Sequence, residues 1–175
     1  TKKSGNKYFV MRNEKAISNI EKVWDFMGDP ENHLTEEGRA QVAKAAEELK
    51  AKGIDVIISS PIVRTQETAK IVAENIGINP NQIITDDRII EWQVGKEFQG
   101  KTIDEYIQIR NASENRYTFK IDGFESYQDV TKRCGEFLHD IDSQYQGKNI
   151  LVVTHNSAAR GSVLSAQGFT FETLL

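Results

Sequence analysis

"DVIISSPIVRTQETAKIVAENIG", residues 55–77, is the stretch that decides the fold. It opens with a short apolar run, 55–59, which has the length and composition of a buried strand. Ser60 and Pro61 then form a pair typical of a helix N-cap and first helical position, and Gly77 is typical of a helix end. Apolar residues at helical spacing lie between them: Ile62, Ala69, Val72 and Ile76. The stretch therefore predicts a strand that leads directly into an amphipathic helix.

The alternation of strand and helix continues along the rest of the chain. Runs similar to 55–59 occur at 7–12, 82–85 and 149–154. Strands separated by helical patterns are typical of a mostly parallel sheet covered on both faces. The sequence thus predicts an α/β three-layer sandwich with a mostly parallel central sheet and helices on both faces. No repeat or linker divides the chain, so one domain over 1–175 is expected.

Start signals mark the other helices. Thr35 precedes a stripe formed by Val42, Ala46 and Leu49, and Gly53 is a suitable end for that helix. Ser126-x-x-Asp129 predicts a capping box before a long helix over 126–146. Its apolar stripe includes Val130, Cys134, Ile141 and Tyr145. Thr102-x-x-Glu105 predicts the start of a shorter helix.

The composition excludes several classes of protein. Hydrophobic residues make up 38% and charged residues 27%, as in an ordinary globular chain. A net charge of −4 argues against general nucleic-acid binding, and no apolar run is long enough to cross a membrane. The single cysteine, Cys134, excludes an internal disulfide and suits a cytoplasmic location. One cysteine and three scattered histidines also argue against a structural zinc site. The sequence leaves the oligomeric state open.

Three basic side chains follow the predicted strands at the points where these end. Arg12 comes at the end of 7–12, His155 follows 149–154, and Arg64 lies in the first turn of the helix after 55–59. The carboxyl ends of parallel neighbours meet at one edge of a sheet, where ligands bind in this architecture. Two guanidinium groups, an imidazole and helix N-termini at one edge are suited to an oxyanion, most naturally phosphate. Each residue alone would more often be structural, and it is their shared edge that favours a site.

Six blocks of sequence resemble the histidine phosphatase superfamily, also called phosphoglycerate mutase-like, in that family's order. They are "RNEKAISN" (12–19), "LTEEGRAQ" (34–41), "ISSPIVRTQETA" (58–69), "EWQVGKEFQG" (91–100), "GFESYQDV" (123–130) and "VVTHNSAARG" (152–161). Any one block would be weak evidence. Six blocks spread over essentially the whole chain imply that family's three-layer fold.

The resemblance also implies a mechanism and a set of roles. In the family, a histidine after the first arginine takes up the phosphoryl group, a carboxylic acid protonates the leaving oxygen, and water then releases phosphate. Arg12, Asn19, Arg64 and His155 match positions that hold the phosphoryl oxygens. Glu91 matches the acid, and Glu97 is a second candidate nearby. A small phosphorylated substrate or ligand is implied, and no metal or organic cofactor.

The chain departs from the family at its most reactive position. Without a gap, the nucleophilic histidine corresponds to Asn13, the following glycine to Glu14 and the family's glutamate to Lys15. An amide nitrogen shares its lone pair with the carbonyl, so Asn13 could bond a phosphate oxygen but could not carry a phosphoryl group. A missing His-Gly pair before Asn13 would shift Asn19 out of register, so the ungapped alignment is preferred. Asn156 also stands where a glycine commonly follows the second histidine.

Other chemistry remains open at the sequence level. His33 lies in a loop that could reach the pocket as a substitute nucleophile, and water activated by Glu91 or His155 could attack directly but slowly. Substrate specificity is expected from 20–33 and 86–125. Aromatic residues there would wall a substrate or simply form a hydrophobic cap: Trp24, Phe26 and Trp92.

Two functional hypotheses follow. The first is a phosphatase or mutase by ancestry that acts on or binds phosphate monoesters, with its activity impaired by the substitution at residue 13. The second is a non-catalytic pseudophosphatase that binds a phosphorylated metabolite or protein. Within the first, a phosphatase is favoured because the chain is short and lacks long insertions over the pocket. Whether it is an enzyme is left open.

Overall fold

The centre of the molecule is a parallel sheet. The computed structural model describes residues 4–100, 102, 104, 108, 112, 115, 117–120 and 124–166. Within them the sheet has the strand order β1-β4-β2-β3 and every pairing is parallel. The strands are β1 (Lys7–Arg12), β2 (Val56–Ser59), β3 (Ile84–Thr85) and β4 (Asn149–Thr154). The predicted parallel sheet is confirmed.

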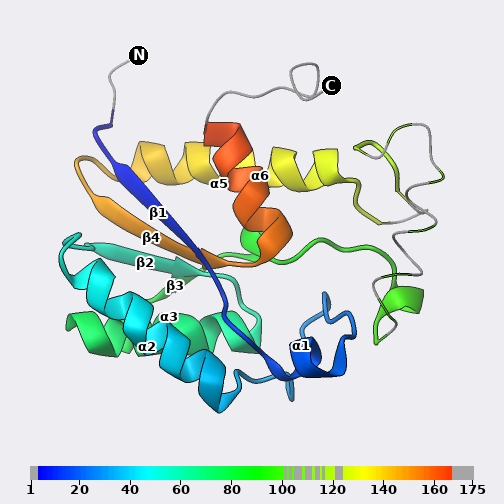
Figure 1. Ribbon diagram of the computed structural model, residues 1–175. Helices are drawn as coiled ribbons and strands as arrows, with labels where there is room; N and C mark the ends of the chain where they lie inside the picture. Colours follow the sequence, from blue (N-terminus) through cyan, green and yellow to red (C-terminus); the bar gives the residue numbers. More distant parts are fainter. Residues whose placement is uncertain are drawn as a thin grey trace.

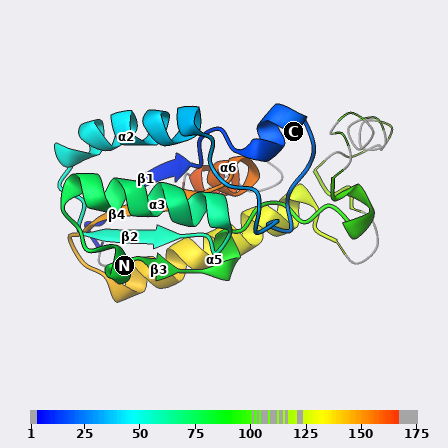
Figure 2. The same cartoon turned by 90° about the horizontal axis from the view of Figure 1, so that it is seen from below.

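Helices cover both faces of this sheet (Figures 1 and 2). The helices α2 (Glu36–Lys50) and α3 (Val63–Ile76) lie on one face. The helices α5 (Tyr127–Gln144) and α6 (Asn156–Ala166) lie on the other. Short helices connect these layers: α1 (Ile17–Glu21) and the 3₁₀ helices η1 (Pro80–Gln82), η2 (Asp87–Ile89) and η3 (Lys96–Phe98). The three-layer sandwich is therefore confirmed.

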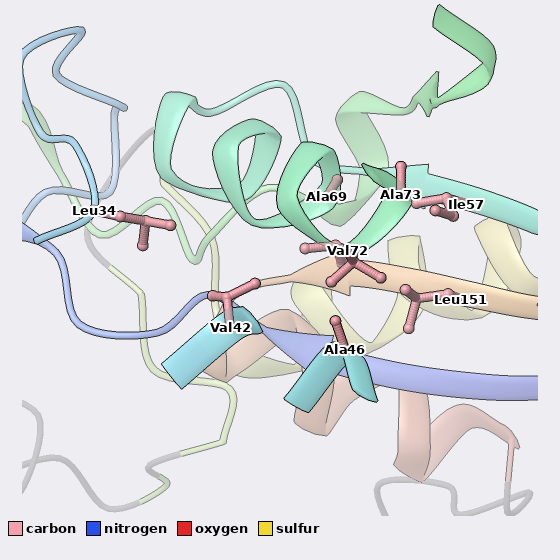
Figure 3. Close-up of a cluster of buried hydrophobic side chains, with 9 residues drawn as sticks. Leu34, Val42, Ala46, Ile57, Ala69, Val72, Ala73 and Leu151 are labelled. Atoms are coloured by element: carbon pink, nitrogen blue, oxygen red, sulfur yellow. The ribbon is translucent and has the colours of Figure 1, made fainter. Parts of the chain in front are cut away.

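Alternate residues of the central strands build two separate cores. Ile57 and Leu151 pack against α2 and α3, together with Val42 and Val72 (Figure 3). The next residue along each strand, Ile58 or Val152, faces the opposite layer. There it meets Phe137 and Ile141 of α5. This period of two explains why the strands are almost uniformly apolar, since both faces are buried.

Two predicted helix starts are confirmed by their caps. The Thr35 hydroxyl accepts from the Gly38 N–H at the start of α2. At the start of α5, Ser126 and Asp129 form the predicted capping box. Gly38 has a further reason to be glycine, because a Cβ there would lie 2.2 Å from the carbonyl oxygen of Lys15. The chain after β1 therefore packs directly against the first turn of α2.

Two boundaries differ from the prediction. The helix α3 begins at Val63 with Ile62 as its N-cap, not at Ser60. The Ser60 hydroxyl lies instead 2.8 Å from Nε2 of His155, a tertiary contact that the local sequence could not reveal. The strand β3 has two residues because η1 occupies the stretch before it. The predicted helix at Thr102-x-x-Glu105 lies largely outside the described residues.

The carboxyl ends of β1, β4 and β2 come together at one edge. The parallel register pairs Arg12 with Thr154. The ladder extends one step further, because the Asn13 N–H donates to Thr154 and the Ser60 N–H donates to Val153. No helix of the described part is apolar and long enough to span a membrane. The edge that carries Arg12 and His155 is where the candidate site lies.

Candidate functional site

A pocket of about 270 Å³ opens at this edge of the sheet. Three segments build most of its wall: the chain after β1 with α1, the loop over 23–26, and the start of α6. Its lining consists of Arg12, Asn13, Ser18, Asn19, Val23, Trp24, Asp25, Phe26, Arg64, Glu91, Asn156 and Ser157. The structure thus brings all of the predicted site residues except His155 onto one surface.

Arg12 is the exposed cation of this pocket. It ends β1, where the parallel register with β4 fixes its backbone. Among the described residues no side chain or carbonyl accepts a hydrogen bond from its guanidinium. An uncommitted guanidinium carries five N–H donors in a geometry that matches phosphate oxygens. Arg12 is therefore available to an anionic ligand.

Arg64 also lines the pocket, but it is bound within the protein. Its side chain is 7% exposed, and Nη1 donates to Oδ2 of Asp25 at 2.6 Å. Nη2 donates to the backbone oxygen of Asp25 at 2.8 Å and to Nδ1 of His155 at 3.2 Å. A guanidinium can bind two oxygens at once along either of two edges, Nη1 with Nη2 or Nε with Nη2, and both edges use Nη2. Because its two N–H groups are occupied, Arg64 can offer a ligand single hydrogen bonds but no bidentate grip.

His155 lies behind Arg64 and is 1% exposed. A guanidinium can only donate, so Nδ1 accepts from Arg64 and the ring proton is assigned to Nε2, which donates to the Ser60 hydroxyl. Burial, reinforced by the charge of Arg64, lowers the pKa of His155 well below its usual value. The imidazole is therefore neutral at pH 7 and holds Arg64 in place. Direct contact between His155 and a phosphate, which the resemblance implies, stays a prediction.

Glu91 lies at the N-terminus of α6. Its Oε1 accepts hydrogen bonds from the N–H groups of Trp92 (2.8 Å) and Ser157 (3.2 Å). A carboxylate at this position interacts favourably with the helix dipole and bonds an otherwise unpaired N–H. The predicted acid is thus held on the pocket lining. The side chain of Glu97, the second candidate for the acid, lies outside the described part of the structure.

The three asparagines of the predicted site have different surroundings. Asn13 lines the pocket, and its Nδ2 donates to the carbonyl oxygen of Glu14 at 2.9 Å. Asn19 is also on the lining, where its Oδ1 accepts from the Ala16 N–H and holds the first turn of α1. Asn156 is exposed at the start of α6. All three residues are therefore on the lining, and the side chains of Asn13 and Asn19 also bond the local backbone.

Two further residues discussed from the sequence, Lys15 of the substituted triplet and the candidate nucleophile His33, are not on the pocket lining. The Lys15 ammonium pairs with Glu37 of α2 at 2.7 Å and is not on the lining. The Nδ1 atom of His33 lies 3.0 Å from a carboxylate oxygen of Glu67 on α3. The structure therefore gives no support to His33 as a substitute nucleophile. Among the described residues, no three histidine, cysteine or acidic side chains are grouped so that they could hold a metal ion.

The aromatic residues near the pocket lie both on its wall and in a hydrophobic cluster behind it. Trp24 and Phe26 are on the lining, while Trp92 is buried in a cluster with Phe26, Val94 and Phe98. Trp24 meets Phe26 and Trp92 edge to face at centroid distances of 6.4 and 6.5 Å. These rings wall one side of the pocket, and behind it they form a hydrophobic cap.

Asp25 is the main site residue that sequence reasoning missed. Its side chain is 4% exposed and lies between two aromatic residues in the sequence. An aspartate between two aromatic residues could have indicated a buried site residue, because a carboxylate buried among rings needs a charged or hydrogen-bonding partner. Asp25-x-x-Gly28 is also typical of a turn in which the carboxylate accepts backbone N–H groups, as it does here.

Arg133 was also missed. Its guanidinium forms two hydrogen bonds to Glu125, and Nη1 donates to the carbonyl oxygens of Arg88 and Ile90. Nη2 also lies 3.2 Å from the carbonyl oxygen of Glu91. The sequence signal is weak, an arginine beside the apolar stripe of α5. Arg133 nevertheless fixes the backbone that presents Glu91.

Comparison with known proteins places this geometry in a family. Residues 12–175 match the model of the histidine phosphatase superfamily (branch 1). The chain is 29% identical over 163 residues to phosphoserine phosphatase 1 of Hydrogenobacter thermophilus, covering 87% of this chain and 74% of that protein. It is 32% identical over 158 residues to phosphoglycerate mutase-like protein 4 of Arabidopsis thaliana, covering 86% and 66%.

Solved structures share the fold. YhfR of Bacillus stearothermophilus superposes with a TM-score of 0.81 at 25% identity, covering 97% of this chain and 83% of that one. A phosphoserine phosphatase of Entamoeba histolytica, solved in complex with 3-phosphoglyceric acid, gives a TM-score of 0.77 at 22% identity and covers 94% and 81%. The match along nearly the whole chain shows that this protein belongs to the histidine phosphatase superfamily.

Proposed function

We propose that this protein binds a phosphate monoester in the pocket without taking up its phosphoryl group on residue 13. The observation that carries the proposal is the pair at the end of β1: Arg12, exposed and uncommitted among the described residues, and next to it Asn13 on the lining. The arginine is suited to phosphate oxygens. The amide beside it cannot form a phosphoramidate intermediate, because its nitrogen is neither basic nor nucleophilic.

The relatives support a phosphorylated ligand. The proteins compared above are called a phosphoserine phosphatase and a phosphoglycerate mutase-like protein, names that refer to phosphate monoesters. The volume of about 270 Å³ suits a small molecule. The family explains why a pocket with arginine at this edge is present, and Asn13 explains why phosphoryl transfer to the chain would be absent.

Binding is tested by calorimetric titration with phenyl phosphate. We expect saturable binding by the unmodified protein and a loss of affinity of about tenfold or more for Arg12→Ala, since a hydrogen bond to a charged group contributes roughly 1.5–3 kcal/mol. Lys15→Ala is the matched control, because it also removes a cation close in sequence but off the lining. Absence of binding by the unmodified protein, or equal losses in both variants, would contradict the proposal.

Transfer is tested with 4-nitrophenyl phosphate. We expect no phosphorylated protein from the unmodified chain, and acid-labile phosphorylation once the family triplet is restored by Asn13→His, Glu14→Gly and Lys15→Glu together. Acid-labile phosphorylation of the unmodified chain would overturn the assignment of Asn13.

Slow direct hydrolysis is a second candidate that one observation favours. Glu91 is on the lining and its Oε1 is fixed by two backbone N–H groups, so the carboxylate is oriented. It could activate a water molecule, an effect worth about 10²–10⁴-fold. Hydrolysis by the unmodified chain that Glu91→Gln abolishes and that leaves the protein unphosphorylated would favour this candidate.

A further inference from the structure

The Asp25 carboxylate is surrounded by donors. Its Oδ2 accepts from Nη1 of Arg64 and from Nδ2 of Asn32, both at 2.6 Å. Its Oδ1 accepts from Nε2 of Gln99 at 2.9 Å, and from the backbone N–H groups of Gly28 (3.0 Å) and Asp29 (2.8 Å). One charged guanidinium and four neutral donors thus converge on a single pair of oxygens.

The local backbone is shaped for this convergence. Gly28 has φ +81°, and a Cβ there would lie 3.0 Å from the side chain of Ile62. This position therefore favours glycine, which lets the chain turn so that two successive N–H groups point at one oxygen. Asn32 is held from its other side, since its Nδ2 also donates to Ser18 and its Oδ1 accepts from the Ser18 N–H. The donors are fixed by the fold and do not depend on the carboxylate alone.

The carboxylate is charged in this setting. Burial by itself would raise the pKa of Asp25, but the hydrogen bonds from Asn32 and Gln99 and the nearby charge of Arg64 lower it below its usual value. A charged carboxylate in contact with Arg64 offsets the charge that Arg64 would otherwise present to the pocket. Among the described lining residues, Arg12 is then the cation that has no carboxylate partner.

We propose that Asp25 is a specificity-determining residue. Its carboxylate occupies an anion-binding site that the fold builds from Arg64, Asn32, Gln99 and two backbone N–H groups, and it thereby acts as an internal anion. Its consequence for ligand choice rests on the proposed function, because it concerns a phosphorylated ligand of the same pocket. With the internal anion in place, the pocket offers a phosphate Arg12 and single hydrogen bonds from Arg64. With it removed, the same donors become available to an added anion.

The test is chemical rescue. In Asp25→Ala, formate at about 0.1 M should occupy the vacated site and raise the midpoint of thermal unfolding, because a ligand that binds only the folded state stabilises it. The unmodified protein, whose site is filled, should show no formate effect beyond that of chloride at equal ionic strength. Asp29→Ala is the matched control, since it removes a neighbouring carboxylate whose one hydrogen bond within the described residues is from the local N–H of Glu31.

The outcomes separate this inference from the proposed function. Formate stabilisation confined to Asp25→Ala supports the inference, as does a variant that folds only when formate is present. Asp25→Ser, which keeps one acceptor, should show a smaller effect of the same sign. Equal responses in all variants, or an Asp25→Ala chain that formate leaves unfolded, would overturn the inference even if phenyl phosphate binds the unmodified protein.

A second arm measures ligand choice. Calorimetry with inorganic phosphate should give an affinity for Asp25→Ala at least about tenfold higher than for the unmodified protein, because an uncompensated guanidinium bonds phosphate strongly. The effect should disappear in Asp25→Ala combined with Arg64→Met. Phosphate binding that is equal in the unmodified protein and Asp25→Ala refutes the specificity role and leaves the proposed function standing. Binding by Asp25→Ala alone would refute the proposed function and uphold the inference.

Discussion

Arg12 and Arg64 line the same pocket and carry the same charge, yet their surroundings differ. Arg64 is buried, paired with Asp25 and hydrogen-bonded to a neutral imidazole. Arg12 is exposed, and no described residue accepts a hydrogen bond from its guanidinium. For a ligand this difference matters more than the shared charge, because Arg12 can offer a bidentate pair of hydrogen bonds, whereas Arg64 would have to give up an existing bond to do so.

Arg133 provides a prediction at the residue scale. Its side chain is 15% exposed and it bonds three backbone carbonyls as well as Glu125. Arg133→Gln should lower the free energy of unfolding by about 2–3 kcal/mol, since hydrogen bonds to a charged group are lost and partly buried carbonyls lose their donor. Urea denaturation measures the change. Lys132→Gln, an exposed neighbour on α5, is the control and should change stability by less than about 0.5 kcal/mol.

If Arg133 also positions Glu91, its substitution should weaken phenyl phosphate binding or hydrolysis in the folded protein. Arg133→Lys should then recover stability only in part, because an ammonium cannot bond Glu125 and the three carbonyls together. Equal stability of Arg133→Gln and Lys132→Gln would contradict the role given to the guanidinium.

Arg12 and Arg64 could be placed at the site from the residues alone, because Arg12 ends β1 and Arg64 lies in the first turn of the helix after β2. Glu91, which follows η2, was named only through the family resemblance. Asp25 could not be predicted in the same way, since two of its side-chain partners, Arg64 and Gln99, come from distant parts of the chain. The lowered pKa of His155 likewise results from its burial and from the charge of Arg64, which are tertiary features that no local pattern encodes.

At the scale of elements, the chain after β1 is fixed against α2 and α3 by a network centred on Glu67. One of its oxygens accepts from Nη2 of Arg39 at 2.7 Å, and the other accepts from the Leu34 N–H at 2.7 Å. Burial alone would raise the pKa of Glu67, but these bonds lower it below its usual value. The network joins the start of α2 to α3 beside the site.

This network predicts a pH dependence. A carboxyl whose pKa is lower in the folded state binds fewer protons there than in the unfolded state. Its contribution to stability is therefore complete above the unfolded pKa, near 4, and is lost as the pH falls through the folded pKa. Urea denaturation between pH 6 and pH 2.5 should therefore show falling stability. In Glu67→Gln the fall should be shallower, and an unchanged slope would contradict this linkage.

The existence of the helices and strands could be predicted from the sequence more reliably than the residues at which they begin. Caps at Thr35 and Ser126 are local, so α2 and α5 begin as expected. The predicted start of α3 was wrong by two residues, and the predicted cap Ser60 bonds His155, a residue from the far end of the chain. Local signals thus define helices well where the capping residue has no tertiary partner.

For the whole molecule, two cores share one sheet, so both layers should unfold together. Ile150 and Leu151 are neighbours in β4 that face opposite layers, and both are fully buried. Ile150→Ala and Leu151→Ala should each cost about 2–5 kcal/mol. Fluorescence and circular dichroism should follow one coincident transition in each variant. Val163→Ala, 44% exposed, should change little, and separate transitions for the two layers would contradict a shared core.

The most direct test of the central claim, phosphate-monoester binding without transfer to residue 13, is a ³¹P NMR titration of phenyl phosphate with the unmodified protein. Saturable broadening or shift of the ester signal is predicted, with no phosphorylated-protein signal, and Arg12→Ala should abolish the change. An unperturbed ester signal at millimolar protein, or the appearance of a phosphoramidate signal, would contradict the account.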